Sequence, residues 1–304
     1  MTEERGRGWG AALALALFAV LVSSIHPALL LAVPLGLLMV GLPPLRSPYR
    51  LVGALLLVLL FAAPMGGAVW MAERGWSLLV GGSFLAVVAL WPRGGFLHRG
   101  LAAIAAAVVV AAAVLGIGGA WRGLEMQVAE RFRAAADFWS ERMTAGDAAG
   151  AEQAAETFAR IAELEIHLYP AMLTLASLAA LGAVWFAYRR LVDRSRDVLP
   201  PLRQFRFDDH LVWLFIVGAV LVVVPLNEAA SRAGANLATF MAALYVLRGA
   251  AVVIALTAPA GLMAWLLAGF AVLMLPFVAG AALIVGLSDT WLDLRARMAA
   301  RGES

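Results

Sequence analysis

Residues 189–213 read RRLVDRSRDVLPPLRQFRFDDHLVW and form the long polar break in the second half of an otherwise apolar chain. The stretch holds six arginines against four aspartates and turns abruptly into an apolar run at Leu211. Arginines close to the ends of membrane spans favour the cytoplasmic side of a membrane. We therefore expect the loop 189–206 to be cytoplasmic, and this expectation orients every apolar segment before and after it.

The composition of the chain indicates the class of protein. The 304 residues are 63% hydrophobic and 14% charged, with a mean hydropathy of +0.88, whereas soluble domains are about 45–50% apolar and about 25% charged. Apolar runs of the length that crosses a bilayer as a helix recur along the chain. Helices are expected because lipid cannot hydrogen-bond to free backbone groups. The sequence thus predicts an all-α, polytopic helical membrane protein.

Several functional classes are disfavoured by what the sequence lacks. The net charge is +3, but the arginines stand near span ends, so we expect the lipid bilayer, and no nucleic acid, as a partner. There is no cysteine, which excludes disulfides and thiolate sites. All 23 basic residues are arginine, so no lysine-containing phosphate loop exists, and zinc-protease and serine-hydrolase motifs are absent. We expect no enzyme activity, no cofactor and no metal site, and any driving ATPase to be another chain.

The order of apolar and polar segments predicts three parts. Eight to ten membrane segments are expected, with both termini cytoplasmic. The number is a range because the apolar segments 9–42 and 262–287 each cross the membrane either once or twice. Glu73-Arg74-Gly75 is expected to be a tight external turn between two spans. The predicted parts are N-terminal membrane helices at 1–120, an external amphipathic helical hairpin at 121–167, and C-terminal membrane helices at 168–304 that include the basic loop 189–206.

The predicted hairpin has a different composition from its surroundings. Residues 121–167 carry nine acidic and five basic residues, which is a net charge of 5 − 9 = −4. Apolar side chains recur at helical spacing on both sides of the break at Thr144–Asp147, and Asp147 is the expected N-cap of the second helix. The acidic balance favours the external side of the membrane.

Arg248 is the most informative single residue, because it stands near the middle of an apolar span. A guanidinium at that depth costs about 2.5–3.5 kcal/mol on insertion scales, so it usually faces a partner or a wet cavity. Asn227, Glu228 and Asp289 are the candidate partners. Together with Arg232 and Asn236, the first two could line the mouth of a substrate cavity. The alternatives are a structural ion pair for Arg248 and an ordinary polar loop for the others.

The basic loop continues into a second group of candidate residues. Asp208, Asp209 and His210 have no spacing specific for a metal site, and an N-cap role explains either aspartate. We interpret the group as a topology-setting and partner-docking loop. The residues to which we assign this topology and partner role are Arg203, Phe205, Arg206, Asp208 and Asp209.

Three stretches carry a resemblance to a known family: LRQFR at 202–206, LYVLRGAAVV at 244–253 with Asn236 before it, and GLSDTWLDLR at 286–295. They resemble the YybS-like family of bacterial predicted membrane proteins, a domain of unknown function. That family is distantly similar to the substrate-binding (S) components of energy-coupling-factor vitamin transporters. The resemblance implies a compact helical protein that binds a small molecule and docks on a separate transmembrane coupling subunit. The small-residue pattern Ala12-x-x-x-Ala16 fits such docking.

These features lead to two functional hypotheses. The first is a transport-type subunit of the bacterial cytoplasmic (inner) membrane, which binds a small ligand and depends on a coupling subunit for energy. The second is a non-transporting scaffold or assembly protein of the envelope, which docks an envelope protein through 121–167 and the loop 189–206.

Overall fold

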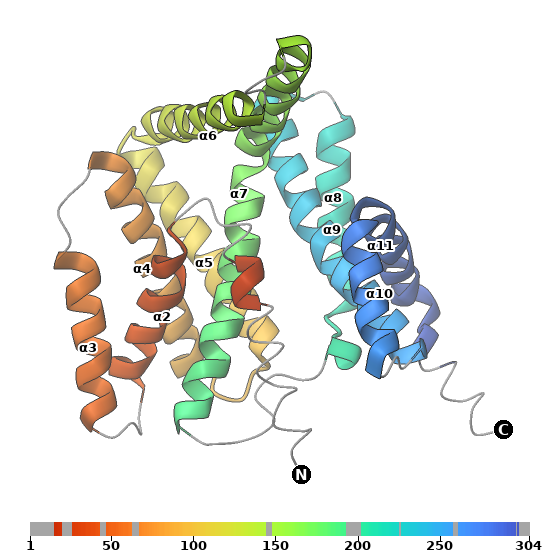
Figure 1. Ribbon diagram of the computed structural model, residues 1–304. Coiled ribbons are helices and arrows are strands. Elements are labelled where there is room, and N and C mark those ends of the chain that lie inside the picture. The colour runs from red at the N-terminus through yellow and green to blue at the C-terminus, as the bar shows by residue number, and fades with distance from the viewer. Residues whose placement is uncertain are drawn as a thin grey trace. The chain divides into compact units, whose positions relative to one another are not determined.

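The computed structural model describes residues 15–19, 26–42, 47–62, 67–143, 148–192, 202–224, 226–257, 261–295 and 297. Throughout these residues the regular elements are helices, with no strand, which confirms the all-α fold class. The chain divides into two compact units, residues 1–199 and 200–304, and their elements are labelled in Figure 1.

The described helices include five that are long and apolar enough to cross a membrane. They are Met71–Leu90, Phe96–Ile117, Glu152–Leu191, Glu228–Thr257 and Leu275–Leu292. Three shorter apolar helices cover Ala28–Gly41, Pro48–Ala62 and Asp209–Val223. The prediction of a polytopic helical membrane protein is therefore confirmed.

The first unit packs around one long helix, α7. Its elements are α2 (Pro27–Gly41), α3 (Ser47–Ala62), α4 (Gly67–Leu90), α5 (Phe96–Ile117), α6 (Trp121–Met143) and α7 (Ala148–Val192). Helix α2 contacts α3, α4 and α7, and α4 contacts α5. Leu30 and Val33 of α2 pack in a buried cluster with Ala176 and Ala180 of α7, where the small alanines let the two helices approach closely.

The predicted external turn at Glu73-Arg74-Gly75 is wrong, because these residues lie inside α4. The helix accommodates the two charges by pairing them: Glu73 binds Arg131, and Arg74 Nε donates to the carbonyl oxygen of Leu60 at 3.1 Å. The connection between α3 and α4 covers 63–66 instead, outside the described residues.

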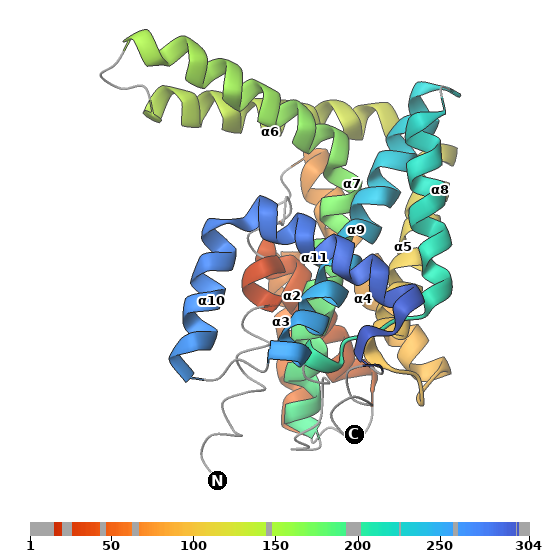
Figure 2. The ribbon, with the colours of Figure 1, turned by 90° about the vertical axis from the view of Figure 1, so that its right-hand side faces the viewer.

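The segment 121–167 forms two helices, but the second does not end at 167. Helices α6 and the first part of α7 run side by side (Figure 2), and Arg133 Nε donates to Glu163 Oε1 between them at 3.0 Å. The predicted break at Thr144–Asp147, with its Asp147 cap, lies outside the described residues. Helix α7 then runs for 45 residues, past Pro170. Within that run the Thr174 hydroxyl donates to the carbonyl oxygen of Pro170 at 2.9 Å. The helix is therefore continuous at position 167, where the sequence predicted a boundary between hairpin and span.

The second unit is built around α9. Its elements are the short 3-10 helices η1 (Leu202–Gln204) and η2 (Asp209–Leu211), then α8 (Val212–Val223), α9 (Glu228–Thr257), α10 (Gly261–Leu273) and α11 (Leu275–Leu292). Helix α9 packs against α8 and α11. The sequence left open whether 262–287 forms one segment or two. The region consists of two helices that meet at Met274, whose backbone departs from helical geometry.

Glycines set how closely α9 and α11 approach. A Cβ atom on Gly249 would overlap the carbonyl oxygen of Ala282, and one on Gly286 would overlap the carbonyl oxygen of Tyr245. No residue with a side chain fits at either position without moving the backbones. This close crossing places Arg248 of α9 opposite Asp289 of α11.

Candidate functional site

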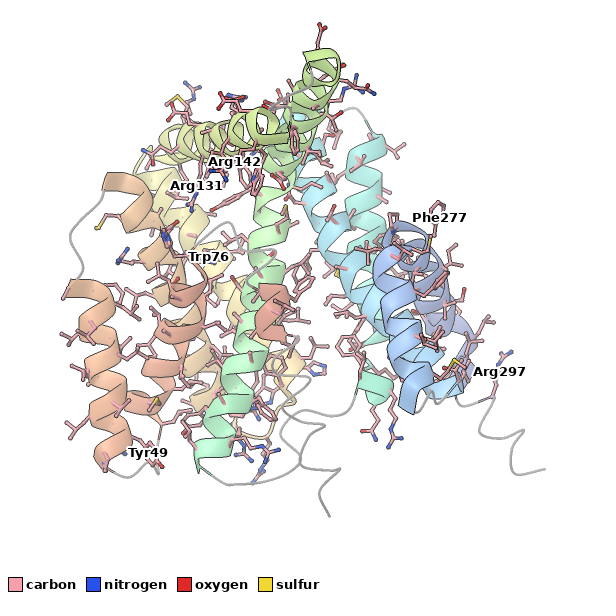
Figure 3. The ribbon with its side chains drawn as sticks, in the orientation of Figure 1. Tyr49, Trp76, Arg131, Arg142, Phe277 and Arg297 are labelled. Atoms are coloured by element: carbon pink, nitrogen blue, oxygen red, sulfur yellow. The ribbon has the colours of Figure 1, made fainter. Side chains whose placement is uncertain are left out.

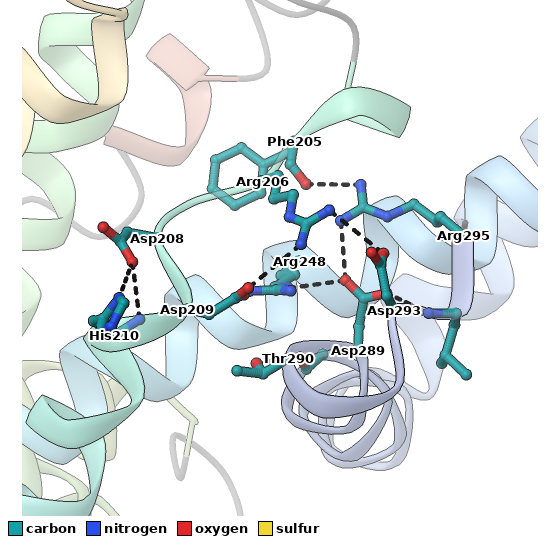
Figure 4. Close-up of polar contacts among 12 residues, drawn as sticks. Phe205, Arg206, Asp208, Asp209, His210, Arg248, Asp289, Thr290, Asp293 and Arg295 are labelled. Carbon is teal, nitrogen blue, oxygen red and sulfur yellow. Dashed lines mark hydrogen bonds and ion pairs between the residues drawn. The ribbon is translucent and has the colours of Figure 1, made fainter. Parts of the chain in front are cut away.

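Arg248 lies at the centre of a cluster of charges in the second unit (Figure 4), in which Arg248 and Asp289 are fully buried and the outer members are partly exposed. Its side chain is fully buried, its Nε donates to Asp289 Oδ2 at 3.0 Å, and its Nη1 donates to Asp209 Oδ1 at 2.6 Å. Asp289 is one of the three partners proposed from the sequence. The sequence places Asp209 in the loop group and does not indicate it as a partner of Arg248. The fold brings it to Arg248 as a second partner.

Asp289 accepts from more than Arg248. Its Oδ2 also accepts from Arg295 Nη2 at 3.0 Å, and its Oδ1 accepts from the backbone N–H of Leu294 at 3.1 Å. Asp293 ends α11 in the left-handed conformation (φ 41°), which turns the chain back so that Arg295 reaches the carboxylate. The Asp289 carboxylate therefore has the bonded partners that a buried charge needs.

The loop 205–209 closes over Arg248. Phe207 is buried, and Arg248 Cζ lies 5.4 Å from the centre of its ring, a cation–π geometry. Arg295 Nη1 donates to the carbonyl oxygen of Phe205 at 3.1 Å. Arg206 lies 3.4 Å from both Asp209 and Asp293. Burial lowers the pKa of Arg206, but Asp293, Asp209 and Asp289 together outweigh burial and hold that pKa above its ordinary value.

The charges in this cluster balance. Three arginines (206, 248 and 295) interact with three aspartates (209, 289 and 293). No unpaired charge is left among them for a ligand to neutralise. One guanidinium nitrogen, Arg248 Nη2, is buried without a hydrogen-bond partner in the described part of the chain. The arrangement ties the loop to α9 and α11 and has the geometry of a structural clamp.

The other residues proposed as ligand-binding stand apart from Arg248. Asn227 Oδ1 accepts from the backbone N–H of Ala230 at 2.8 Å and caps α9, while Glu228 is exposed in the first turn of that helix. Asn236 Nδ2 donates to the carbonyl oxygen of Arg232 within α9. Glu228 and Arg248 are twenty positions apart on one helix, about 30 Å at 1.5 Å per residue. The structure does not bring these residues together.

The remaining loop residues have separate local roles. Asp208 is the N-cap of η2 and accepts from the backbone N–H of His210 at 3.0 Å, which is the capping role proposed for one of the two aspartates. Arg203 is exposed and offers its carbonyl oxygen to Arg295 at 3.5 Å. Among the described residues, no group of three or more histidine, aspartate or glutamate side chains is placed to hold a metal ion.

The first unit contains a cavity that the sequence did not reveal. Its volume is about 520 Å³, and residues of α4, α5, α6 and α7 line it. Helix α6 lies across one end of α4 and α5 and forms one wall (Figures 1 and 2). Most of the lining is apolar, including Leu79, Leu115, Val128 and Phe132. The volume lies within the range of about 300–1,000 Å³ usual for small-molecule sites.

A buried carboxylate marks the polar end of this cavity. Glu73 of α4 is buried; its Oε1 accepts from Arg131 Nη1 of α6 at 2.6 Å, and its Oε2 lies 2.9 Å from His26 Nδ1. Ser77 Oγ donates to the carbonyl oxygen of Glu73. In the view of Figure 3, Arg131 lies on α6 above Trp76 of α4.

Two further polar side chains line the cavity. The indole N–H of Trp76 donates to Ser177 Oγ at 2.9 Å, so its hydrogen-bonding capacity is used. Gln127 Oε1 of α6 is buried and has no hydrogen-bond partner among the described residues. Buried acceptors are normally bonded, so Gln127 Oε1 is an unsatisfied polar atom beside the cavity.

Sequence reasoning missed the cavity because it treated Glu73 as part of a turn and 121–143 as a helix outside the bundle. A usable signal was present: Glu73 and Arg74 are charges in a segment otherwise apolar enough to span a membrane. Ionisable residues in such segments are functional candidates by default.

Comparisons with known proteins give one match. A family model described as "Predicted membrane protein (DUF2232)" matches residues 10–290. No curated protein matches, and no solved structure matches.

Proposed function

The chain belongs to the DUF2232 family of predicted membrane proteins, and on that premise we propose that it is a transport-type membrane subunit that binds a small ligand and has no ATPase of its own. We place it in the bacterial cytoplasmic membrane with both termini cytoplasmic. A separate transmembrane coupling subunit supplies the energy. The protein itself catalyses no reaction.

The observation that carries this proposal is the cavity of about 520 Å³ between α4, α5, α6 and α7. It combines apolar walls with a few convergent polar groups, the usual composition of a ligand site. The charges clustered around Arg248 support a different role. Because they neutralise and bond one another, they favour a structural clamp over a ligand site.

Filling the cavity tests the proposal. Gly123 of α6 lines the cavity, and a Cβ atom added there would have no atom within 4 Å, so Gly123→Leu adds volume to the cavity without an initial clash. Gly116→Leu in α5 is the matched control, since its added Cβ atom also has open space and Gly116 does not line the cavity. Both changes replace a helical glycine with a better helix former.

The measurement is mass spectrometry of small molecules that co-purify with each protein from native membranes. We expect one or more molecules to accompany the unaltered chain and Gly116→Leu and to be depleted from Gly123→Leu. The same set of molecules in all three preparations would overturn the proposal. Cross-linkers placed in the first apolar segment (9–42) and in the loop 189–206 are expected, in those membranes, to trap a partner complex that contains an ATPase.

The second candidate function is a scaffold of the envelope. It is favoured by the exposed apolar side chains of the helical hairpin, Phe138 and Trp139 on α6 and Ile161 and Leu164 on α7, which a docking partner would cover. Cross-links that form through 121–167 instead of through the first span, together with an empty cavity, would favour this scaffold role.

A further inference from the structure

The second half of α6, residues 133–142, extends the helical hairpin beyond the cavity. We propose that this segment is an interfacial anchor: Phe138 and Trp139 insert at the boundary between lipid head groups and acyl chains, and Arg142 binds lipid phosphate. The partner is the bilayer that the spans of this chain cross. Three observations lead to this surface: where α6 begins, which of its faces points toward the spans, and which side chains that face carries.

Helix α6 begins at the level where a span ends. Helix α5 is a candidate membrane span that ends at Ile117, and α6 starts four positions later at Trp121. Trp121 is 46% exposed, and tryptophan is enriched at membrane–water interfaces. Figures 1 and 2 show α6 lying across the ends of α4 and α5 instead of continuing their direction. Helix α6 therefore runs along the membrane surface.

One face of α6 points toward the spans. Val128 and Arg131 line the cavity on that face, and Arg131 bonds to Glu73 of α4. The first part of α7 packs elsewhere on α6, where Arg133 donates to Glu163. In Figure 2 this part of α7 begins above α6, on the side away from α4 and α5. Helix α7 therefore leaves the face toward the membrane uncovered.

The face toward the spans continues past the cavity. Among the described residues, those of α6 that line the cavity end at Phe132. At 3.6 residues per turn, Phe138 and Arg142 return to the side of Arg131, and Trp139 returns to the side of Phe132. Phe138 is 46% exposed and Trp139 is 54% exposed. Beyond the ends of the spans this face meets lipid, and an amphipathic helix in that position buries its apolar side chains in the bilayer interface.

The charges of α6 suit lipid phosphate on this face. Arg142 stacks on Phe138 at 4.5 Å, so its guanidinium stands beside the apolar anchor, and arginine forms strong charge-assisted bonds with phosphate. The acidic residues Glu130, Asp137 and Glu141 share a different side of the helix, about 100° away. Helix α6 carries four acidic and four basic residues in all. Apolar insertion and the phosphate contact therefore hold the segment, and anionic lipid is not required.

The depth of single labels in a bilayer tests the anchor. Ala135→Cys, on the face toward the spans, and Asp137→Cys, on the acidic side, are each made in the cysteine-free chain; both positions are exposed. Each full-length variant carries a nitroxide and is reconstituted into phosphatidylcholine vesicles. Relaxation by oxygen, which enters lipid, and by a water-soluble nickel chelate gives the depth of the nitroxide. We expect the label at 135 about 5–10 Å below the phosphates and the label at 137 in water.

Removal of the anchor adds a second readout. Phe138→Ser with Trp139→Ser, combined with the label at 135, should bring that label out of the lipid and into contact with the nickel chelate. The control is Ile161→Ser with Leu164→Ser on α7, a pair of similar exposure, which should leave the depth at 135 unchanged. If the first double variant does not yield a monodisperse protein, the comparison of labels at 135 and 137 decides alone.

Each other outcome overturns the anchor. A label at 135 that reacts with the nickel chelate as readily as the label at 137 would show that water covers this face. A label at 135 shielded from both reagents would show that protein covers it, as a second copy of the chain would. Equal loss of depth in the two double variants would remove Phe138 and Trp139 as the inserted side chains. None of these outcomes bears on ligand binding in the cavity, so the proposed function is tested separately.

Discussion

Arg248 and Asp289 are 41 positions apart in the chain, yet their fully buried side chains meet at a hydrogen bond of 3.0 Å between α9 and α11. The two helices can approach this closely because Gly249 and Gly286 face backbone atoms at the crossing. The charged pair and the glycine pair therefore belong to one contact: the glycines permit the approach, and the ion pair selects its register.

The first prediction concerns the loss of Arg248. Arg248→Met should lower the free energy of unfolding by about 3–5 kcal/mol, because Asp289 and Asp209 each lose a partner and Asp289 stays buried. Thermal or denaturant unfolding of the purified protein in detergent measures the effect. Arg203→Gln, at an exposed residue that contributes a backbone oxygen to the cluster, is the control and should change stability by no more than about 0.5 kcal/mol. Equal stability of the Met variant and the control would show that the cluster does not act as a clamp.

The second prediction concerns the glycine crossing. Gly249→Ala should destabilise the second unit by at least about 1–3 kcal/mol, because the new methyl group overlaps the carbonyl oxygen of Ala282 and forces the helices apart. Gly280→Ala in α11 has open space around the added Cβ atom and should be neutral or slightly stabilising, since alanine is the better helix former. Unfolding midpoints of the two alanine variants, compared in one detergent, give the answer; similar midpoints would contradict the close crossing.

The third prediction concerns Arg131, which holds the buried carboxylate of Glu73. Arg131→Met should cost about 1–3 kcal/mol, because the Glu73 carboxylate loses the guanidinium and keeps His26 as its neighbour. Arg142→Met removes a guanidinium from the same helix, where it stacks on Phe138 at 4.5 Å, and should cost less than about 1 kcal/mol. Denaturant titration measures the loss in free energy of unfolding for each variant. A larger loss for Arg142→Met than for Arg131→Met would contradict the role of Arg131 as the partner of Glu73.

The fourth prediction concerns topology. Single cysteines at Ala149 and Ser195, introduced into the cysteine-free chain, should react differently with a membrane-impermeant maleimide on intact cells. Position 149 should be labelled, and position 195 should be labelled only after permeabilisation. Labelling at 195 without labelling at 149 would invert the orientation.

The first unit supplies a structural reason for this orientation. Arg50 near the start of α3, Arg93 and Arg99 around the start of α5, and Arg189 and Arg190 at the end of α7 lie at one end of its helices (Figure 1). The described acidic residues of the unit stand on α6, the first half of α7 and near the start of α4, at the other end, together with arginines 74, 122, 131, 133, 142 and 160. Arginines at span ends favour the cytoplasmic face.

Local properties of the sequence determined the class of this protein. The length of the apolar runs and the low share of charged residues predicted an all-α membrane protein, because each span is stabilised by lipid whatever its neighbours are. The capping by Asp208 was predictable for a similar reason, since a cap depends on residues within a few positions. Arg248 was recognisable because a charge within an apolar run is costly in lipid whatever its neighbours are.

Tertiary structure decided the pairings. Asp208 and Asp209 are adjacent and chemically identical, but one caps its own turn, while the other bonds to Arg248, 39 positions away. Glu73 stays inside a helix because Arg131, 58 positions further on, reaches it from α6, and the cavity exists only where four helices meet. Hydropathy and charge determine how each segment interacts with lipid or water, whatever the other segments do. These contacts instead depend on which helices lie side by side, and that follows from the packing of the whole unit.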